Sequence, residues 1–566
     1  MGRKAAAFRL KKKARYTLAG AMNAADAVAE ILKREGTEFL IGYPVNSIIE
    51  AAARADIRTI IVRQERTGLH MADAVSRVCS GQRVGVFAMQ HGPGTENAFG
   101  GVAQAYGESS PIVVLPGGYS RRQINVPPNF NAYLNYQHVT KWCEQVMLAD
   151  AVPDAMRRAF TQVRNGRPRP VLVEFPSDVM AEEVPEPLTY KPAPRARSAP
   201  DPQAVAEAAD MLLKAERPVI YAGQGVHYAR AWQPLRELAE LLEAPVTASL
   251  EGKSAFPEDH PLSLGVGSRA IPKAVRHFLN QADVIFGVGC SFATTNYGVR
   301  LPRNGPKYIQ ATLDAADLNK EMPIEHALLG DADLTLRALI AEIKERLHGK
   351  PRERAAAIAQ EIATVRDEWL AEWKPKLTCN DTPLSPYRVI WDLLHTVDVA
   401  NTIITHDAGS PRDQMAPFWR PTEPLGYIGW GKTTQLGYGL GLAMGAKLAR
   451  PDKLCINVWG DAAIGFTGMD FETAVRERIP ILSILLNNFS MAIELKVMAV
   501  ATEKFRSTDI SGNYADMARA FGGYGERVTD PSEIVPAIKR GIQQTQEGRP
   551  ALLEFITQKE TKTSDY

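Results

Sequence analysis

The feature of the sequence that most constrains the fold is a repeated alternation between short apolar runs and amphipathic stretches. Runs such as Thr59–Val62, Val84–Ala88 and Val171–Phe175 are bounded by charged or turn-forming residues, and stretches of helical periodicity separate them. Buried parallel strands are continuously apolar, and each needs a crossover helix to reach its neighbour. The pattern therefore predicts an α/β fold of doubly wound parallel sheets.

The length of the chain, 566 residues, exceeds what one hydrophobic core can hold, since cores stop growing at about 250–300 residues. A proline-rich stretch from Met180 to Pro202 and a charged helical stretch from Arg352 to about Pro383 predict two domain boundaries. We expect three domains, at 18–185, 200–350 and 380–566, the last with a lid. The first and third blocks have similar size and pattern, as two related domains would.

The charge and the apolar runs exclude several classes of protein. The 66 basic and 64 acidic residues nearly cancel, which argues against a nucleic-acid partner. The longest apolar runs, such as Ile479–Leu486, are far shorter than the roughly 20 residues that cross a bilayer. Five scattered cysteines fit a reducing cytoplasm, and residues 1–17 predict a basic flexible tail. We expect a cytoplasmic protein without a membrane partner.

Polar residues follow two apolar runs of the third block. Gly460 and Asp461 come directly after Leu454–Val458, and Asn488 follows the next run, 27 positions after Asp461. A helix and a returning strand fit that interval, so both side chains should lie at the carboxyl edge of adjacent parallel strands. Oxygen ligands of this kind suit Mg²⁺, and Gly460 lets the backbone approach a phosphate closely. The spacing predicts a magnesium site.

This arrangement resembles the thiamine-diphosphate-dependent enzymes of the acetolactate synthase and pyruvate oxidase type, whose hallmark is Gly-Asp followed by Asn-Asn. The resemblance implies a pyrimidine-binding, a central nucleotide-binding and a diphosphate-binding domain. Asp461, Asn488 and the carbonyl of Ser490 would hold Mg²⁺. The amides of Ala462 and Ala463 would bind the diphosphate of thiamine diphosphate.

Two further motifs carry the resemblance. Glu65, in Gln64-Glu65-Arg66-Thr67-Gly68, matches the family glutamate that pairs with N1′ of the aminopyrimidine and promotes its imino tautomer. A carboxylate buried against a cofactor ring should have a raised pKa, which suits proton transfer. Leu436, in Gln435-Leu436-Gly437, would wedge beneath the cofactor and force its two rings into a V shape.

The resemblance also places other residues around the cofactor. His91 could polarise a substrate carbonyl or only hydrogen-bond its own loop. Glu494, in a lid over the reacting carbon, could act as acid or base on a substrate oxygen, or could be a surface glutamate. The remaining expected residues are Gln90 and Asn131 beside the substrate, and Val45, Asn46, Pro93, Asn97 and Ser410 beside the cofactor.

The middle block carries a nucleotide-like pattern. Gly223 and Gly225 follow one apolar run, and Asp331 follows another. Their order resembles the family's central domain, which holds FAD in some members and ADP or the ADP half of coenzyme A in others. Arg167 lies where members contact the adenine nucleotide, whereas Thr312 replaces an expected aspartate. We expect ADP or coenzyme A rather than FAD, with an empty groove as the alternative.

The substrate class remains open between two branches of the family. Pro44-Val45 and Gly100-Gly101 resemble oxalyl-CoA decarboxylases and 2-hydroxyacyl-CoA lyases, whereas Asp407–Arg412 departs from them. The first expectation is a lyase that cleaves a 2-hydroxyacyl-CoA to an aldehyde or ketone plus formyl-CoA. The alternative is an acetolactate-synthase-type 2-keto acid decarboxylase and carboligase. The substrate would be an acyl-CoA thioester or a 2-keto acid.

Two other classes are less favoured. A non-catalytic cofactor-binding homologue would not need Glu65, Asp461 and Asn488 together. A nicotinamide dehydrogenase would rest on Gly223-Gln224-Gly225 alone, without residues for hydride transfer. In the family, the first domain of one chain faces the third domain of its partner. The resemblance therefore implies a homodimer or homotetramer with active sites at the subunit interface.

Overall fold

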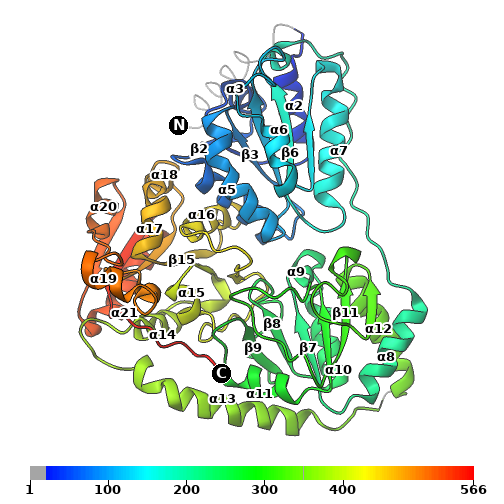
Figure 1. Cartoon of the computed structure of the whole chain (residues 1–566), viewed down its shortest axis with the longest axis vertical. Coiled ribbons are helices and arrows are strands. Elements are labelled where there is room, and N and C mark those ends of the chain that lie inside the picture. The colour runs from blue at the N-terminus through cyan, green and yellow to red at the C-terminus, as the bar shows by residue number, and fades with distance from the viewer. Residues whose placement is uncertain (1–20, 349) are drawn as a thin grey trace, which may run out of the picture. The chain divides into compact units, whose positions relative to one another are not determined.

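The computed structural model describes residues 21–348 and 350–566, so the predicted basic tail lies outside the described residues. It contains three parallel six-stranded sheets flanked by helices (Figure 1), which confirms the predicted α/β class. The described chain divides into two compact units, residues 21–76 with 82–195, and residues 77–81 with 196–566. Each predicted domain range contains one sheet, and the ends of the domains stay predictions.

The first unit contains a sheet with the strand order β2-β1-β3-β4-β6-β5. Its strands are β1 (Phe39–Tyr43), β2 (Arg58–Ile61), β3 (Gly85–Met89), β4 (Ile112–Gly118), β5 (Trp142–Gln145) and β6 (Val171–Pro176). Its helices are α2 (Ala24–Arg34), α3 (Asn46–Arg54), α4 (Glu65–Val78), α5 (Pro93–Gly107), α6 (Ala132–Tyr136) and α7 (Val152–Arg164).

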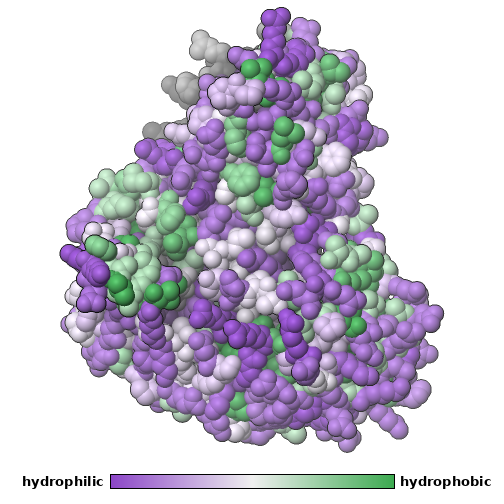
Figure 2. Space-filling view, in the orientation of Figure 1, coloured by the Kyte–Doolittle hydropathy of each residue, from purple (hydrophilic) through white to green (hydrophobic). Residues whose placement is uncertain are grey.

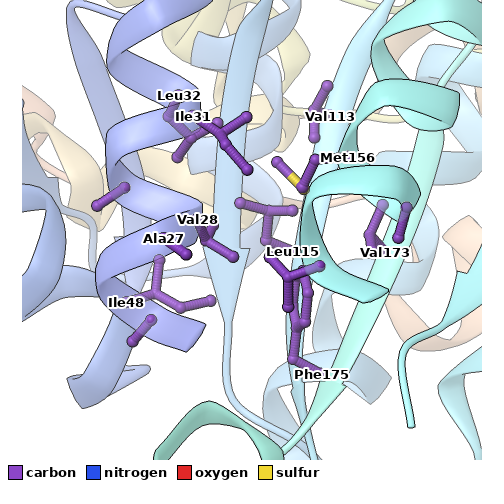
Figure 3. Packing of buried hydrophobic residues seen from close by; sticks show 14 of the residues in the cluster. Ala27, Val28, Ile31, Leu32, Ile48, Val113, Leu115, Met156, Val173 and Phe175 are labelled. Atoms are coloured by element: carbon purple, nitrogen blue, oxygen red, sulfur yellow. The ribbon is translucent and has the colours of Figure 1, made fainter. Parts of the chain in front are cut away.

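The core of this unit shows why its helices form where they do. Helix α2 begins after Asn23, whose side chain accepts the backbone N–H of Asp26 and so caps the first turn. Its apolar residues recur at helical spacing, and Ile31 and Val28 face the sheet beside Leu115 of β4 (Figure 3). Burying a side chain of this size contributes about 1.5–3 kcal/mol.

The central sheet of the second unit has the order β12-β11-β10-β7-β8-β9. The order reverses between β7 and β10, which makes their carboxyl ends the switch point of the sheet. The strands are β7 (Pro218–Ala222), β8 (Val246–Ser249), β9 (Ser263–Gly267), β10 (Val284–Val288), β11 (Lys307–Thr312) and β12 (His326–Leu329). The helices are α8 (Pro202–Lys214), α9 (Gly225–Ala229), α10 (Trp232–Leu242), α11 (Lys273–Gln281), α12 (Ala332–Leu347) and α13 (Ala355–Leu377).

The C-terminal sheet has the order β14-β13-β15-β16-β18-β17, in which strands take the same relative places as in the first sheet. This agrees with the expected kinship of the first and third blocks. The strands are β13 (Thr402–His406), β14 (Tyr427–Ile428), β15 (Leu454–Gly460), β16 (Leu482–Asn487), β17 (Tyr524–Val528) and β18 (Ala551–Ile556). The helices are α14 (Pro386–Thr396), α15 (Ser410–Met415), α16 (Tyr438–Ala449), α17 (Asp461–Thr467), α18 (Phe471–Arg476), α19 (Ala499–Phe505), α20 (Tyr514–Ala520) and α21 (Ile534–Gln546).

Two further observations concern the helices of the described chain. The charged stretch predicted as helical after Arg352 is the long helix α13. Across residues 21–348 and 350–566, no helix combines the length and the apolar character needed to cross a lipid bilayer.

Candidate active site

A cavity of about 100 Å³ opens at the carboxyl end of the C-terminal sheet. Its lining residues come mainly from the loops after β13, before α16, after β15 and after β16, together with Pro386 of α14 and Thr557 after β18. All nine residues that the sequence predicted in this domain lie on its wall. They are Ser410, Leu436, Gly460, Asp461, Ala462, Ala463, Asn488, Ser490 and Glu494.

The register of the sheet explains why Asp461 and Asn488 meet. Strands β15 and β16 pair in parallel, with Gly460 opposite Leu486, so both strands end at the same edge. Asp461 begins α17 directly after β15, and Asn488 follows the last residue of β16. Local sequence therefore places both side chains at one edge, as expected from their spacing.

Asp461 joins the two strand ends. Its Oδ1 accepts the N–H of Ala462 at 2.9 Å, and its Oδ2 accepts the N–H of Ser490 at 3.0 Å. The side chain is buried, and burial raises the pKa of Asp461 while the hydrogen bonds from Ser490 and Ala462 oppose that rise. A bound cation would favour the ionised carboxylate in this place.

Asn488 and Ser490 each have a side-chain oxygen that could bind a cation. Asn488 Oδ1 and Ser490 Oγ are both buried, and neither has a hydrogen-bond partner among the described residues. A buried polar atom left unpaired costs about 1–3 kcal/mol, so such atoms usually serve a ligand or an ordered water. The pair beside Asp461 fits a hard divalent cation with oxygen ligands.

Of the three residues predicted to hold the metal, Asp461 alone has a carboxylate. Within residues 21–348 and 350–566, no group of three His, Cys, Asp or Glu side chains is arranged to hold a metal ion. A cation beside Asp461 would therefore need neutral oxygens of the protein and further oxygens from a ligand. The diphosphate of thiamine diphosphate provides oxygens of that kind.

Gly460 lies directly before the expected metal ligand Asp461. A Cβ added to Gly460 would make only ordinary contacts, the nearest with Pro411 at 3.7 Å, so packing within the protein does not require glycine here. The amide of Ala462 donates to Asp461, which means that this predicted diphosphate donor already has a partner. Ala462 therefore contributes to the site through Asp461.

Gln414 and Thr557 are among the residues of the cavity wall that the sequence did not predict. Gln414 lies in α15, and Thr557 directly follows β18 with its Oγ1 buried and lacking a partner in the described chain. The rule that found Asp461, a polar residue directly after an apolar strand, would also have found Thr557. No signal of that kind marks Gln414.

Most of the residues predicted in the first unit lie at the carboxyl edge of its sheet. Glu65 begins α4 after β2 and is 3% exposed. The others follow β1 or β3 or, for Asn97, lie in the first turns of α5. They are Val45, Asn46, Gln90, His91, Pro93 and Asn97. The ring of His91 lies against that of Tyr119, with centroids 4.4 Å apart.

Two predicted residues of this unit have contacts that differ from those expected. Asn131 caps α6, since its Oδ1 accepts the N–H of Leu134 at 2.9 Å and its Nδ2 donates to Asn125. Arg167 lies before β6, at the amino edge of the sheet, where its Nε donates to Ser109 Oγ at 3.0 Å. Arg167 is therefore at the opposite edge from Glu65.

The glycines of the central sheet are engaged by the protein itself. The N–H of Gly223 donates to Val288 O at 2.9 Å, and that of Gly225 donates to Gly289 O at 2.8 Å. A Cβ on Gly223 would lie 2.3 Å from Gly289 O. The glycines thus permit close packing of two loops at the switch point, and these two amides are already used.

The acidic residue of the nucleotide-like pattern also has a structural role. Asp331 is the N-cap of α12, and its Oδ1 accepts the N–H groups of Asp333 and Leu334 at 3.1 and 3.3 Å. This is the usual arrangement for an aspartate at the start of a helix. The sequence pattern of Gly223, Gly225 and Asp331 therefore gives no support to an ADP site.

Three family models match consecutive parts of the chain. The model of the thiamine pyrophosphate enzyme N-terminal TPP binding domain matches residues 22–148. The models of the central domain and of the C-terminal TPP binding domain match residues 205–339 and 407–555. The chain belongs to the family of thiamine-diphosphate-dependent enzymes.

Similar proteins narrow the type of enzyme. The chain is 29% identical over 563 residues to a probable acetolactate synthase large subunit of Methanocaldococcus jannaschii, across 94% of this chain and 92% of the relative. It is 26% identical to the acetolactate synthase isozyme 3 large subunit of Escherichia coli K12, across 93% of each. It is also 26% identical to glyoxylate carboligase of Escherichia coli O157:H7, across 96% of this chain and 94% of the relative.

The protein is thus an enzyme of the acetolactate synthase type, within a family of thiamine-diphosphate-dependent carboligases. These comparisons favour the alternative expectation over the first one. They give no support to the cleavage of a 2-hydroxyacyl-CoA, which rested on the short motifs around Pro44 and Gly100.

Proposed function

We propose that the protein uses thiamine diphosphate and Mg²⁺ to decarboxylate a 2-keto acid and to join the remaining acyl unit to a second carbonyl compound. The observation that carries the cofactor assignment is the pair of buried, unpartnered oxygens of Asn488 and Ser490 beside Asp461, among the described residues. The names of the similar proteins, acetolactate synthase and glyoxylate carboligase, support the carboligase reaction.

The residues of the cavity divide into two groups. Asp461, Asn488 and Ser490 would hold Mg²⁺, and the backbone at Gly460 and Ala463 would contact the diphosphate. Leu436 supports the ring end of the cofactor. When bound, thiamine diphosphate supplies an electron sink for the carbon that loses carbon dioxide.

Proton transfer falls to two carboxylates in this proposal. Glu65 holds a proton at N1′ of the aminopyrimidine, and its burial at the start of α4 favours a shared proton over an exposed charge. Glu494 gives a proton to the substrate oxygen or takes one from it. Glu494 lies in the 3₁₀ helix η7 (Ala492–Glu494), on the wall of the cavity.

The segment around Glu494 is suited to act as a lid. Its base is closed by two backbone hydrogen bonds, from the N–H of Met491 to Thr508 O at 2.8 Å and from the N–H of Ile510 to Phe489 O at 3.0 Å. Between them, Val497 and Phe505 are 80% and 78% exposed. Closing this segment over a bound substrate would exclude water from the reacting atoms.

The exposed apolar residues near the cavity support assembly with a second copy of the chain. Figure 2 shows apolar side chains gathered over the region of α17 and α19, on the left of the view. Exposed apolar residues of α17 and α19 are Phe466, Val500 and Phe505, each about half exposed or more. Contiguous apolar patches mark interaction surfaces. In the proposed dimer, the edge of one chain's first unit that carries Glu65 covers this surface of its partner, completing the site.

A product survey tests the proposed reaction. The purified protein is incubated with thiamine diphosphate, Mg²⁺ and a panel of 2-keto acids, alone and in pairs that include pyruvate and glyoxylate, and products are identified by mass spectrometry. Release of carbon dioxide with formation of a new carbon–carbon bond is the expected result. Parallel samples contain 2-hydroxyacyl-CoA thioesters, and turnover of these substrates alone would replace the proposal with the lyase reaction.

A nucleotide in the central domain is not part of this proposal. The amides of Gly223 and Gly225 and the carboxylate of Asp331 all have partners within the domain. The absorption spectrum of the purified protein and calorimetric titration with ADP and coenzyme A decide this point. Stoichiometric binding of any of these nucleotides would require a different set of contact residues.

A further inference from the structure

Asp407 is a buried carboxylate that does not line the cavity. It follows β13 directly and is fully buried. Its Oδ1 accepts the N–H groups of Ala408 and Gly437 at 2.8 and 2.9 Å, and its Oδ2 accepts the N–H of Gly439 at 2.9 Å. The carboxylate therefore ties the end of β13 to the first turn of α16, whose N-cap is Gly437.

Gly437 is held from its other side by Thr467. The Oγ1 of Thr467 donates to Gly437 O at 2.8 Å. Gly437 has a φ of +88°, and a Cβ there would lie 2.7 Å from Thr467 Oγ1. Only glycine fits this position, because the left-handed backbone and the close approach of Thr467 both exclude a side chain.

The two contacts fix the residue that precedes Gly437. Both peptide groups of Gly437 are engaged, one by Asp407 and the other by Thr467, and Leu436 is the next residue back along the chain. Thr467 ends α17, the helix that begins with Asp461. The loop that carries Leu436 is therefore bonded to the helix that begins with the expected metal ligand Asp461, and both residues line the same cavity.

From this geometry we infer that Asp407 and Thr467 are positioning residues. They hold the turn that carries Leu436, so that the Leu436 side chain can support the ring end of thiamine diphosphate. This inference rests on the proposed function. Buried carboxylates persist only where hydrogen bonds compensate for lost water, and three backbone donors do so here. Their loss displaces the turn that carries Leu436, whereas the edge with Asp461 and Asn488 keeps its own contacts.

Calorimetric titrations with two ligands test this inference. Thiamine diphosphate reaches both ends of the cavity, whereas inorganic pyrophosphate occupies the diphosphate end alone. In the presence of Mg²⁺, Asp407→Asn should bind thiamine diphosphate about tenfold more weakly, the equivalent of one hydrogen bond to a charged group. Its affinity for pyrophosphate should stay within about twofold of that of the unaltered protein.

Four further variants control for a general loss of folding. Thr467→Val removes the hydroxyl at almost constant volume and should weaken thiamine diphosphate binding by about threefold, while Thr467→Ser keeps the hydroxyl and restores it. Leu436→Ala should reproduce the selective loss. If Asp407 acts through Leu436, the double variant Asp407→Asn/Leu436→Ala should bind no more weakly than the weaker single variant.

The outcomes separate the inference from the proposed function. Equal losses for both ligands, unchanged affinity for both, or additive losses in the double variant would each overturn the positioning role. An unaltered protein that binds pyrophosphate but not thiamine diphosphate would overturn the proposed function, and the inference with it.

Discussion

The central and the C-terminal sheets carry the same sequence signal at their carboxyl edges and use it differently. Each has a glycine at the end of a strand near the point where the strand order reverses, and each has an aspartate at the start of a helix. In the central sheet, Gly223 donates to Val288 and Asp331 caps α12. In the C-terminal sheet, buried oxygens of Asn488 and Ser490 lack partners among the described residues.

The difference shows what separates a structural turn from a ligand site. A Cβ on Gly223 would lie 2.3 Å from Gly289 O, whereas one on Gly460 would make an ordinary contact with Pro411 at 3.7 Å. Packing within the protein thus requires glycine at position 223 and does not require it at position 460. Buried polar groups are usually paired, so unpaired oxygens of residues that also line a cavity, as Asn488 and Ser490 do in the described chain, indicate where a ligand could bind.

The largest effect is expected at Asp461. Asp461→Ala should weaken thiamine diphosphate binding in Mg²⁺ by more than about a hundredfold and abolish turnover, because outer-shell contacts alone account for about 10–100-fold in metal affinity. Titration followed by intrinsic fluorescence measures the affinity. Near-normal turnover of this variant would contradict the comparison. Asp461 at the C-terminal sheet would then have a structural role only, as Asp331 has at the central sheet.

Replacement of Glu494 tests whether a second carboxylate of the C-terminal cavity takes part in the reaction. Glu494→Gln should lower kcat by about a hundredfold, within the range for general acid–base groups, and should leave cofactor affinity unchanged. Single-turnover and steady-state kinetics on the preferred 2-keto acid provide the measurement. Wild-type turnover would make Glu494 a bystander, and loss of cofactor affinity would make it part of the binding surface.

The two glycines offer a matched pair of variants. Gly223→Ala should reduce the free energy of unfolding by about 3 kcal/mol, at the upper end of the usual cost of overpacking. Gly460→Ala should cost less than about 1 kcal/mol, since its φ of −103° suits any residue, yet it should weaken diphosphate binding. Urea unfolding and pyrophosphate titration are run on both. The opposite pattern would assign the ligand to the central sheet.

The smallest effect is expected at Asp331. Asp331→Ala removes the cap of α12 and should reduce the free energy of unfolding by about 1 kcal/mol, with no change in turnover or in thiamine diphosphate affinity. Thermal unfolding and initial rates measure the two quantities. A loss of turnover without a loss of stability would show that this carboxylate contacts a ligand after all.

The sequence predicted the parts of the molecule that depend on local pattern. The apolar run Val171–Phe175 lies within strand β6 (Val171–Pro176), and all nine residues expected in the C-terminal domain line one cavity. Strand ends are set by apolar runs, and parallel pairing then brings them to one edge. These inferences need only short-range signals and the topology of the sheet.

Long-range packing decided what the sequence could not predict. The amide of Gly225 is used by Gly289, which lies on a different strand end, and Gly437 is held by Asp407 and Thr467 from two other elements. No short sequence motif predicts such contacts. The short Pro44-Val45 motif likewise favoured a coenzyme A thioester lyase, whereas similarity along the whole chain favours a carboligase.

The hydrogen bond from Ser490 to Asp461 couples the cavity to the segment above it. Ser490 also pairs with Asp509 at the base of the segment that carries Glu494, so one residue contacts both the expected metal ligand and the hinge. A cation bound by Asp461 would therefore change how firmly Ser490 holds the base of that segment. The rate of proteolytic cleavage in the exposed stretch near Phe505 should therefore depend on whether the cavity is occupied. Loss of the cofactor during storage would then be detected as a change in this cleavage.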